Sequence, residues 1–174
     1  MSVNASFRSV SISDLDDNFF TRIGDDWMLI TAENSRGEVN TMTASWGCAG
    51  ILWNKPVAVC FIRPQRHTYG IVEDTDKLTL SFFAPGEHRD ALRYCGTRSG
   101  RDGDKFAATG LTVAHAEGGA PYVGEANLVL VCRKLYADDL KEGCFIDLDM
   151  LKHYPGKDYH RFYICEIKEA LVRD

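Results

Sequence analysis

The stretch Val57-Ala-Val-Cys-Phe-Ile-Arg-Pro-Gln-Arg-His-Thr-Tyr69 sets the pattern from which the fold is predicted. Its first part, Val57–Ile62, is a run of apolar and β-branched residues of strand length. Similar runs recur along the chain and are separated by turn-rich segments. The predicted strands are Trp27–Ala32, Val57–Ile62, Leu78–Phe83, Asn127–Leu135 and Phe162–Ile167. The chain is therefore predicted to be mainly β.

Helical patterns are short and few. One covers Thr68–Asp74 and opens after Pro64, a second covers Glu87–Tyr94, and a third turn is expected at Asp104–Thr109. So few helices cannot serve as crossovers between all neighbouring strands of a parallel sheet. The pattern favours a closed or nearly closed antiparallel barrel. With 174 residues and no linker, residues 1–174 are expected to form a single domain.

Composition excludes several classes of function. The 20 Lys and Arg against 25 Asp and Glu give a formal net charge of -5, which disfavours binding to nucleic acid or to an anionic membrane. Residues 1–20 show no targeting pattern and no apolar stretch has the length of a membrane span, so a cytoplasmic protein is expected. The cysteine and histidine spacings predict no metal site, and no Rossmann or Walker A motif is present. The six cysteines are expected to be reduced.

The segment Asn40–Gly47 is a candidate for contacts with a flat heterocycle. Small hydroxyl residues alternate there with apolar ones, which predicts a strand edge with open backbone groups. Each polar atom on the rim of such a ring needs a hydrogen-bond partner once it leaves water. The alternative is a polar strand end that faces solvent.

A second candidate surrounds the predicted start of the helix that follows Pro64. Arg63, Arg66 and Thr68 are of the types that bind phosphate, because Arg gives charge-assisted hydrogen bonds and a helix start favours an anion. The alternative is a solvated basic turn that pairs with Glu73 and Asp74. Together the two segments suggest a mononucleotide or a related phosphorylated cofactor.

Several blocks in order make a family resemblance specific. They are Asn40–Gly47, Leu52–Pro56, Phe61–Arg66 with Thr68-Tyr69, Tyr94–Thr97, Ser99–Asp102 and Asp104–Phe106. The chain resembles the flavin reductase-like, FMN-binding split-barrel family, and its flavoredoxin branch most of all. The resemblance implies a six-stranded antiparallel split barrel with a few short helices, assembled as a homodimer with one FMN per subunit.

The resemblance also implies the residues of a cofactor site. The isoalloxazine ring of FMN would contact Thr41, Met42, Thr43, Ala44, Ser45 and Trp46, and the phosphate would be held by Arg63, Arg66 and Thr68. The loop residues Cys95, Ser99 and Lys105 would close the site or its neighbour across the dimer. His160 is the candidate proton or substrate contact, and the alternative is a structural partner. His67 departs from the family, in which Tyr is more usual.

The implied activity is hydride transfer from NADH or NADPH to flavin N5, in which the cofactor supplies the chemistry. One alternative is an FMN-dependent electron carrier that is reduced by a redox partner protein and has little activity with NADH or NADPH. Another is a thiol enzyme or sensor that uses Cys95, since the neighbouring Arg93 and Arg98 could lower the pKa of its thiol, with Cys48 as a weaker candidate.

Overall fold

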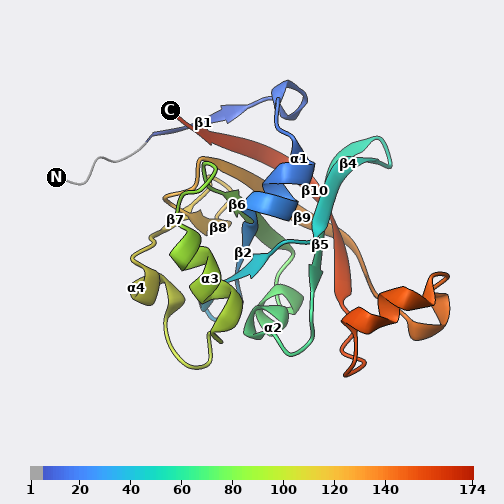
Figure 1. Ribbon diagram of the computed structural model, residues 1–174. Coiled ribbons are helices and arrows are strands. Elements are labelled where there is room, and N and C mark those ends of the chain that lie inside the picture. The colour runs from blue at the N-terminus through green and yellow to red at the C-terminus, as the bar shows by residue number, and fades with distance from the viewer. Residues whose placement is uncertain (1–5) are drawn as a thin grey trace.

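The structure of the protein is a computed structural model that describes residues 6–174, so residues 1–5 of the expected domain lie outside the described part. Its main feature is a strongly bent antiparallel sheet of eight strands (Figure 1). These strands are β1 (Phe7–Val10), β2 (Met28–Glu33), β3 (Val39–Ala44), β4 (Gly47–Leu52), β5 (Lys55–Ile62), β6 (Lys77–Phe82), β9 (Leu128–Asp139) and β10 (Arg161–Arg173). All five strands predicted from the sequence are present.

The order of the strands makes the sheet a split barrel. The path is β3-β2-β6-β9-β10-β5-β4, and β1 pairs with the far end of β10. Six of these strands, from β3 to β5, bring the two ends of their path into contact without a ladder between them. The predicted mainly β antiparallel fold is confirmed, and β4 and β1 extend the six expected strands to eight. The barrel is therefore open between β3 and β5.

The helices are short and pack on the outside of different strands. They are α1 (Phe19–Thr21), α2 (His67–Glu73), α3 (Arg89–Thr97) and α4 (Lys105–Thr109), and turns of other types cover Ile12–Asp14, Arg22–Asp26, Glu142–Cys144 and Leu148–His153. Helix α1 packs against β4, and both α2 and α3 pack against β2. Both α2 and α3 also contact β3. A small separate ladder joins β7 (Val113–His115) to β8 (Pro121–Val123). The three predicted helical segments are thus confirmed as α2, α3 and α4.

Alternation along the strands fills the core. On β5, Ala58, Cys60 and Ile62 face the barrel interior, where they join apolar residues from β6, β9 and β10. Burial of a large apolar side chain such as that of Ile62 stabilises the fold by roughly 1.5–3 kcal/mol. All six cysteines are free thiols, as the sequence predicts, and four of them are buried. Within residues 6–174, no helix is long and apolar enough to cross a membrane.

Residues 140–160 form an excursion between β9 and β10, which we call the β9–β10 arm. It leaves and re-enters the sheet at one point, because Asp139 pairs with Arg161 and the Leu140 amide donates to the His160 carbonyl at 2.8 Å. Figure 1 shows the arm as the orange segment that stands away from the helices. Its last residues return to the barrel beside the end of β5. The arm is therefore placed to form a wall beside the opening between β3 and β5.

We predict that Gly47→Ala destabilises the protein by about 1–3 kcal/mol, whereas Gly50→Ala on the same strand does not. A Cβ at Gly47 would lie 2.9 Å from the Val59 carbonyl oxygen, which the β4–β5 ladder holds in place. A Cβ at Gly50 meets nothing within 4 Å. Urea unfolding of both variants measures the difference, and equal midpoints would contradict the close packing of β4 on β5.

Candidate functional site

A cavity of about 210 Å³ lies where the barrel is open. It is lined by Met42, Thr43, Ala44, Ser45, Trp46, Phe61, Arg63, Arg66 and His160. The residues come from the end of β3, the link to β4, the end of β5, the turn between β5 and α2, and the end of the β9–β10 arm. Eight of the nine belong to the set predicted from the sequence, and they come together from three distant segments.

The β3 edge offers backbone groups more than hydroxyl groups. β3 is the last strand of the sheet path, so its second edge has no strand partner. Its threonine hydroxyls are already engaged, because Thr43 Oγ1 donates to the Leu92 carbonyl at 2.5 Å and Thr41 Oγ1 lies 2.9 Å from Thr31 Oγ1. Thr41 is fully buried and does not line the cavity. A ring beside this strand would therefore find amide and carbonyl groups as its partners.

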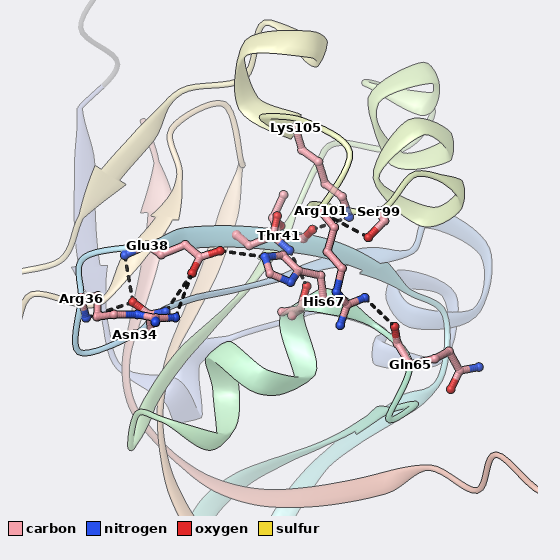
Figure 2. Close-up of polar contacts among 11 residues, drawn as sticks. Asn34, Arg36, Glu38, Thr41, Gln65, His67, Ser99, Arg101 and Lys105 are labelled. Carbon is pink, nitrogen blue, oxygen red and sulfur yellow. Dashed lines mark hydrogen bonds and ion pairs between the residues drawn. The ribbon is translucent and has the colours of Figure 1, made fainter.

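Two cations converge on the last carbonyl groups of α3. Arg66 donates to the carbonyl oxygens of Cys95 and Gly96, at 3.0 and 2.6 Å. Lys105 Nζ donates to the same Cys95 carbonyl at 3.0 Å and to the Thr41 carbonyl at 2.8 Å. Figure 2 shows the Lys105 side chain reaching from α4 down to β3 beside Thr41. Lys105 thus lies behind Arg66 and outside the lining of the cavity.

The positive charges of Arg66 and Lys105 have only neutral carbonyl groups as hydrogen-bond partners and no carboxylate. Lys105 is only 3% exposed, and burial, assisted by the charge of Arg66, lowers its pKa to about 8. Burial also lowers the pKa of Arg66. Within residues 6–174, every hydrogen-bond partner of their charged groups is a neutral carbonyl oxygen. Both are protonated at neutral pH, so the Arg66 end of the cavity is positively charged.

Arg63 differs from Arg66 because its charge is paired. Its guanidinium donates to the Asp158 carboxylate and, at 2.8 Å, to the His153 carbonyl. It also lies over the Tyr154 ring, 5.1 Å from the ring centroid. These contacts hold the β9–β10 arm against the end of β5, and they lower the pKa of the Asp158 carboxyl.

The alternative in which this basic turn pairs with Glu73 and Asp74 is wrong. Glu73 accepts from Arg161 and from the Tyr163 hydroxyl, and Asp74 accepts from Ser35. Both carboxylates therefore have partners elsewhere, and the arm supplies the carboxylate for the turn.

His160 lies inside the site with one ring nitrogen occupied. Its Nδ1 is 2.8 Å from the Tyr154 hydroxyl, and its ring centroid is 5.2 Å from that of Trp46 and 6.3 Å from that of Phe61. Burial, together with the charge of Arg63, lowers the pKa of His160 to about 4. The imidazole is therefore neutral at pH 7.

Four further predicted residues lie outside the cavity lining. The Thr68 hydroxyl is buried and accepts from Asn40 Nδ2 at 3.0 Å, and the Ser99 hydroxyl accepts from the Arg101 amide at 3.2 Å. Cys95 and Lys105 act through the contacts described above, and Cys95 contributes its carbonyl oxygen and not its thiol. Cys95 thus holds Arg66 at the cavity through its carbonyl oxygen, and Thr68 binds Asn40 of β3, whereas Ser99 contacts only its own turn.

The structure also argues against Cys95 as a reactive thiol. The residue is fully buried, and burial raises the pKa of its thiol. Arg93 points to the surface, where it pairs with Asp90 at 3.2 Å.

His67, the departure from the family pattern, places Nε2 2.7 Å from the Glu38 carboxylate (Figure 2).

Sequence reasoning missed three residues of this site. Phe61 lines the cavity, and strand alternation could have found it, because it lies near the end of β5, two positions before Arg63. Tyr154 and Asp158 contact His160 and Arg63 through the fold of the arm. No spacing in the sequence predicts those contacts.

Within the described residues, no cluster of three metal-ligating side chains occurs.

Comparison with known proteins shows the family to which the chain is similar. A sequence model of the flavin reductase like domain matches residues 20–174. A comparison with curated protein sequences gave no match.

Solved structures share the fold. An FMN-binding domain of a flavin reductases-like enzyme from Shewanella baltica OS155 is 17% identical, with a TM-score of 0.68 over 98% of this chain and 79% of that one. The flavoredoxin of Desulfovibrio vulgaris (Miyazaki F) is 22% identical, with a TM-score of 0.65 over 84% and 68%. An NADH:FAD oxidoreductase of Streptomyces globisporus, solved with NAD and FAD fragments, is 18% identical, with a TM-score of 0.61 over 86% and 77%. Since the family model covers most of the sequence, the chain belongs to the flavin reductase-like family.

Proposed function

We propose that the protein binds FMN in the cavity between β3 and β5 and acts as a flavin reductase that oxidises NADH or NADPH. The observation that carries the proposal is the pair Arg66 and Lys105, whose charges have only carbonyl partners at one end of a cavity bordered by an open strand edge. An anion at that end would complete the compensation of both charges. Family membership and the FMN-binding Shewanella neighbour support the same ligand.

The residues present fit the two parts of FMN. Arg66 lines the cavity and would hold the phosphate, while Lys105 adds positive charge from behind. The backbone of residues 42–46 would pair with the polar rim of the ring, and Trp46 would flank it. When bound, FMN supplies a ring that accepts a hydride.

The chain contributes position and the exclusion of water. Trp46, Phe61 and His160 form an aromatic side of the cavity, which keeps water from one face of a bound ring. The pair Arg63 and Asp158 keeps the arm, and with it His160, in place. Removing water strengthens each polar contact inside the site.

A carrier reduced by a redox partner protein is the second candidate. The similarity to a flavoredoxin favours it, and the same cavity would serve both functions. The two candidates differ in whether NADH or NADPH alone reduces the bound flavin.

We also propose that a homodimer completes the site. The cavity of about 210 Å³ is below the roughly 300–1,000 Å³ of most small-molecule pockets, so a further wall is expected. Large apolar side chains are exposed nearby on α1 and on the β4–β5 hairpin, namely Phe20, Ile51 and Trp53. A second apolar cavity, of about 340 Å³, shares Ser45 and Trp46 with the first and lies beside Phe20. A second copy of the chain would cover this surface.

We predict that Lys105→Met weakens FMN binding about tenfold, or about 1.4 kcal/mol, because the lost positive charge lies behind Arg66 and acts on the phosphate through space, without a direct hydrogen bond. Lys77→Met is the matched control, since Lys77 is exposed and also donates to a carbonyl oxygen. Fluorescence titration with FMN measures both, after circular dichroism has shown that each variant is folded. Equal affinity in Lys105→Met and the control would refute the role of Lys105.

The pKa of Lys105 predicts that FMN affinity depends on pH. Its pKa of about 8 in the free protein means that it is charged below pH 8 and neutral above. The charged form favours an anion, so FMN affinity should fall as pH rises from about 8, by up to about tenfold per pH unit. Titrations between pH 7 and 9.5 test this, and Lys105→Met should have a flatter profile than the wild type.

The choice between reductase and carrier depends on one spectrum. We expect the flavin absorbance of the FMN-loaded protein to bleach when NADH or NADPH is added in an anaerobic cuvette. A spectrum that persists with both donors but bleaches with dithionite would favour the carrier. Failure to take up FMN would contradict both.

The homodimer predicts a solution mass of two chains. Light scattering of the wild type should give that mass, and Ile51→Asp should shift it toward one chain, because a charge would be buried without a partner in the interface. Ile146→Asp is the matched control, because Ile146 is also exposed and lies in the β9–β10 arm. A single-chain mass for the wild type at micromolar concentration would contradict the proposal.

A further inference from the structure

We infer that Tyr154 is a positioning residue that fixes His160 in its Nε2–H tautomer, so that the imidazole presents a neutral hydrogen-bond donor to the cavity. The assignment of the tautomer stands on contacts of this chain alone. Its relevance to flavin reduction rests on the proposed function.

The hydrogen bond between the two residues has one favourable direction. The Tyr154 side chain is buried, and its hydroxyl lies 2.8 Å from His160 Nδ1. If the hydroxyl accepted a proton from Nδ1, its own proton would need another acceptor, and residues 6–174 provide no other partner for it. Buried polar groups are nearly always paired. Tyr154 therefore donates, and Nδ1 is the acceptor.

The proton of the neutral ring must then lie on Nε2. A neutral imidazole has one donor and one acceptor nitrogen, and Nδ1 takes the acceptor role. Around the ring, Tyr154 and Asp158 face it from the arm and Arg63 faces it from the end of β5, whereas Trp46 and Phe61 carry no charge. Burial and Arg63 outweigh Asp158, which keeps the ring neutral at pH 7.

Nε2 is free to meet a ligand. His160 lines the cavity, and within the described residues Nε2 has no hydrogen-bond partner. Every buried side-chain nitrogen or oxygen there has a partner, so an unpaired Nε2 must be accessible from the cavity.

This donor selects the chemistry of its ligand. An Nε2–H favours a carbonyl oxygen or an unprotonated ring nitrogen, and it disfavours another N–H donor. The opposite tautomer would present a lone pair and repel the same carbonyl. Tyr154 thus determines which heteroatom edge the His160 side of the cavity accepts, although it does not line the cavity itself.

The test uses the full chain without added flavin. The ¹⁵N chemical shifts of the His160 imidazole are measured between pH 7 and 8, and His160→Gln identifies its signals. In the wild type we expect an unprotonated Nδ1 and a protonated Nε2. A protonated Nδ1 would overturn the proposal, and this measurement needs no variant of Tyr154 to fold.

Tyr154→Phe tests the role of the hydroxyl, with Tyr159→Phe as the matched control. Tyr159 belongs to the same aromatic cluster, and its ring centroid is 5.1 Å from that of Tyr154. Without the Tyr154 hydroxyl, the proton should exchange between the two nitrogens, which moves the Nδ1 shift, and the midpoint of His160 titration should rise. Tyr159→Phe should keep wild-type values. Identical shifts in Tyr154→Phe and the wild type would overturn the positioning role.

A second readout links the tautomer to the reaction. In the FMN-loaded protein we expect Tyr154→Phe to slow reduction by NADH or NADPH about three- to tenfold, with FMN affinity changed less than twofold. If the protein binds no flavin while the wild-type shifts are as expected, the proposed function fails and the tautomer assignment stands. If reduction is equally fast in both variants, His160 does not contact the reacting groups.

Discussion

The carbonyl oxygen of Cys95 is the acceptor on which the site depends. It receives hydrogen bonds from Arg66, which precedes α2, and from Lys105, which begins α4. Lys105 reaches on to the Thr41 carbonyl of β3. Four segments distant in the sequence are thus joined through the end of α3. The carbonyl end of a helix carries partial negative charge, which explains how two buried cations can share one acceptor.

Two arginines three positions apart have opposite electrostatic roles. Arg63 is neutralised by Asp158, and its charge holds the arm. Arg66 has carbonyl partners only, and its charge remains available to an anion. Their residue type is the same, and the difference comes from the element that each one faces. The cavity consequently has a charged end at Arg66 and an aromatic, neutral side at Trp46 and His160.

The sequence predicts the parts of this structure that depend on local patterns. Strand alternation, the strand-ending Pro64 and the short helices are all local, and the structure confirms them. Residue types indicate the segment that holds residues 42–46 and the turn that holds Arg63 and Arg66, and the family resemblance supplies the individual residues. Lys105 was predicted at the cofactor, yet it lies behind Arg66, since only the packing of α3 and α4 on β3 decides where its long side chain ends. Tyr154 and Asp158 could not be predicted, because irregular turns bring them to the site. Such turns have no hydrophobic periodicity in the sequence.

The place where the arm joins the sheet has an evolutionary consequence. Its two ends are neighbours across the β9–β10 ladder, at Asp139 and Arg161, so the strands would remain paired whatever the length of the excursion. The barrel and the charged end of the cavity are built without it, while Tyr154, Asp158 and His160 all belong to it. Insertions and exchanges in residues 140–160 could therefore alter what the cavity admits while the fold is conserved. The aromatic, neutral side of the cavity can in this way change while its charged end at Arg66 stays the same.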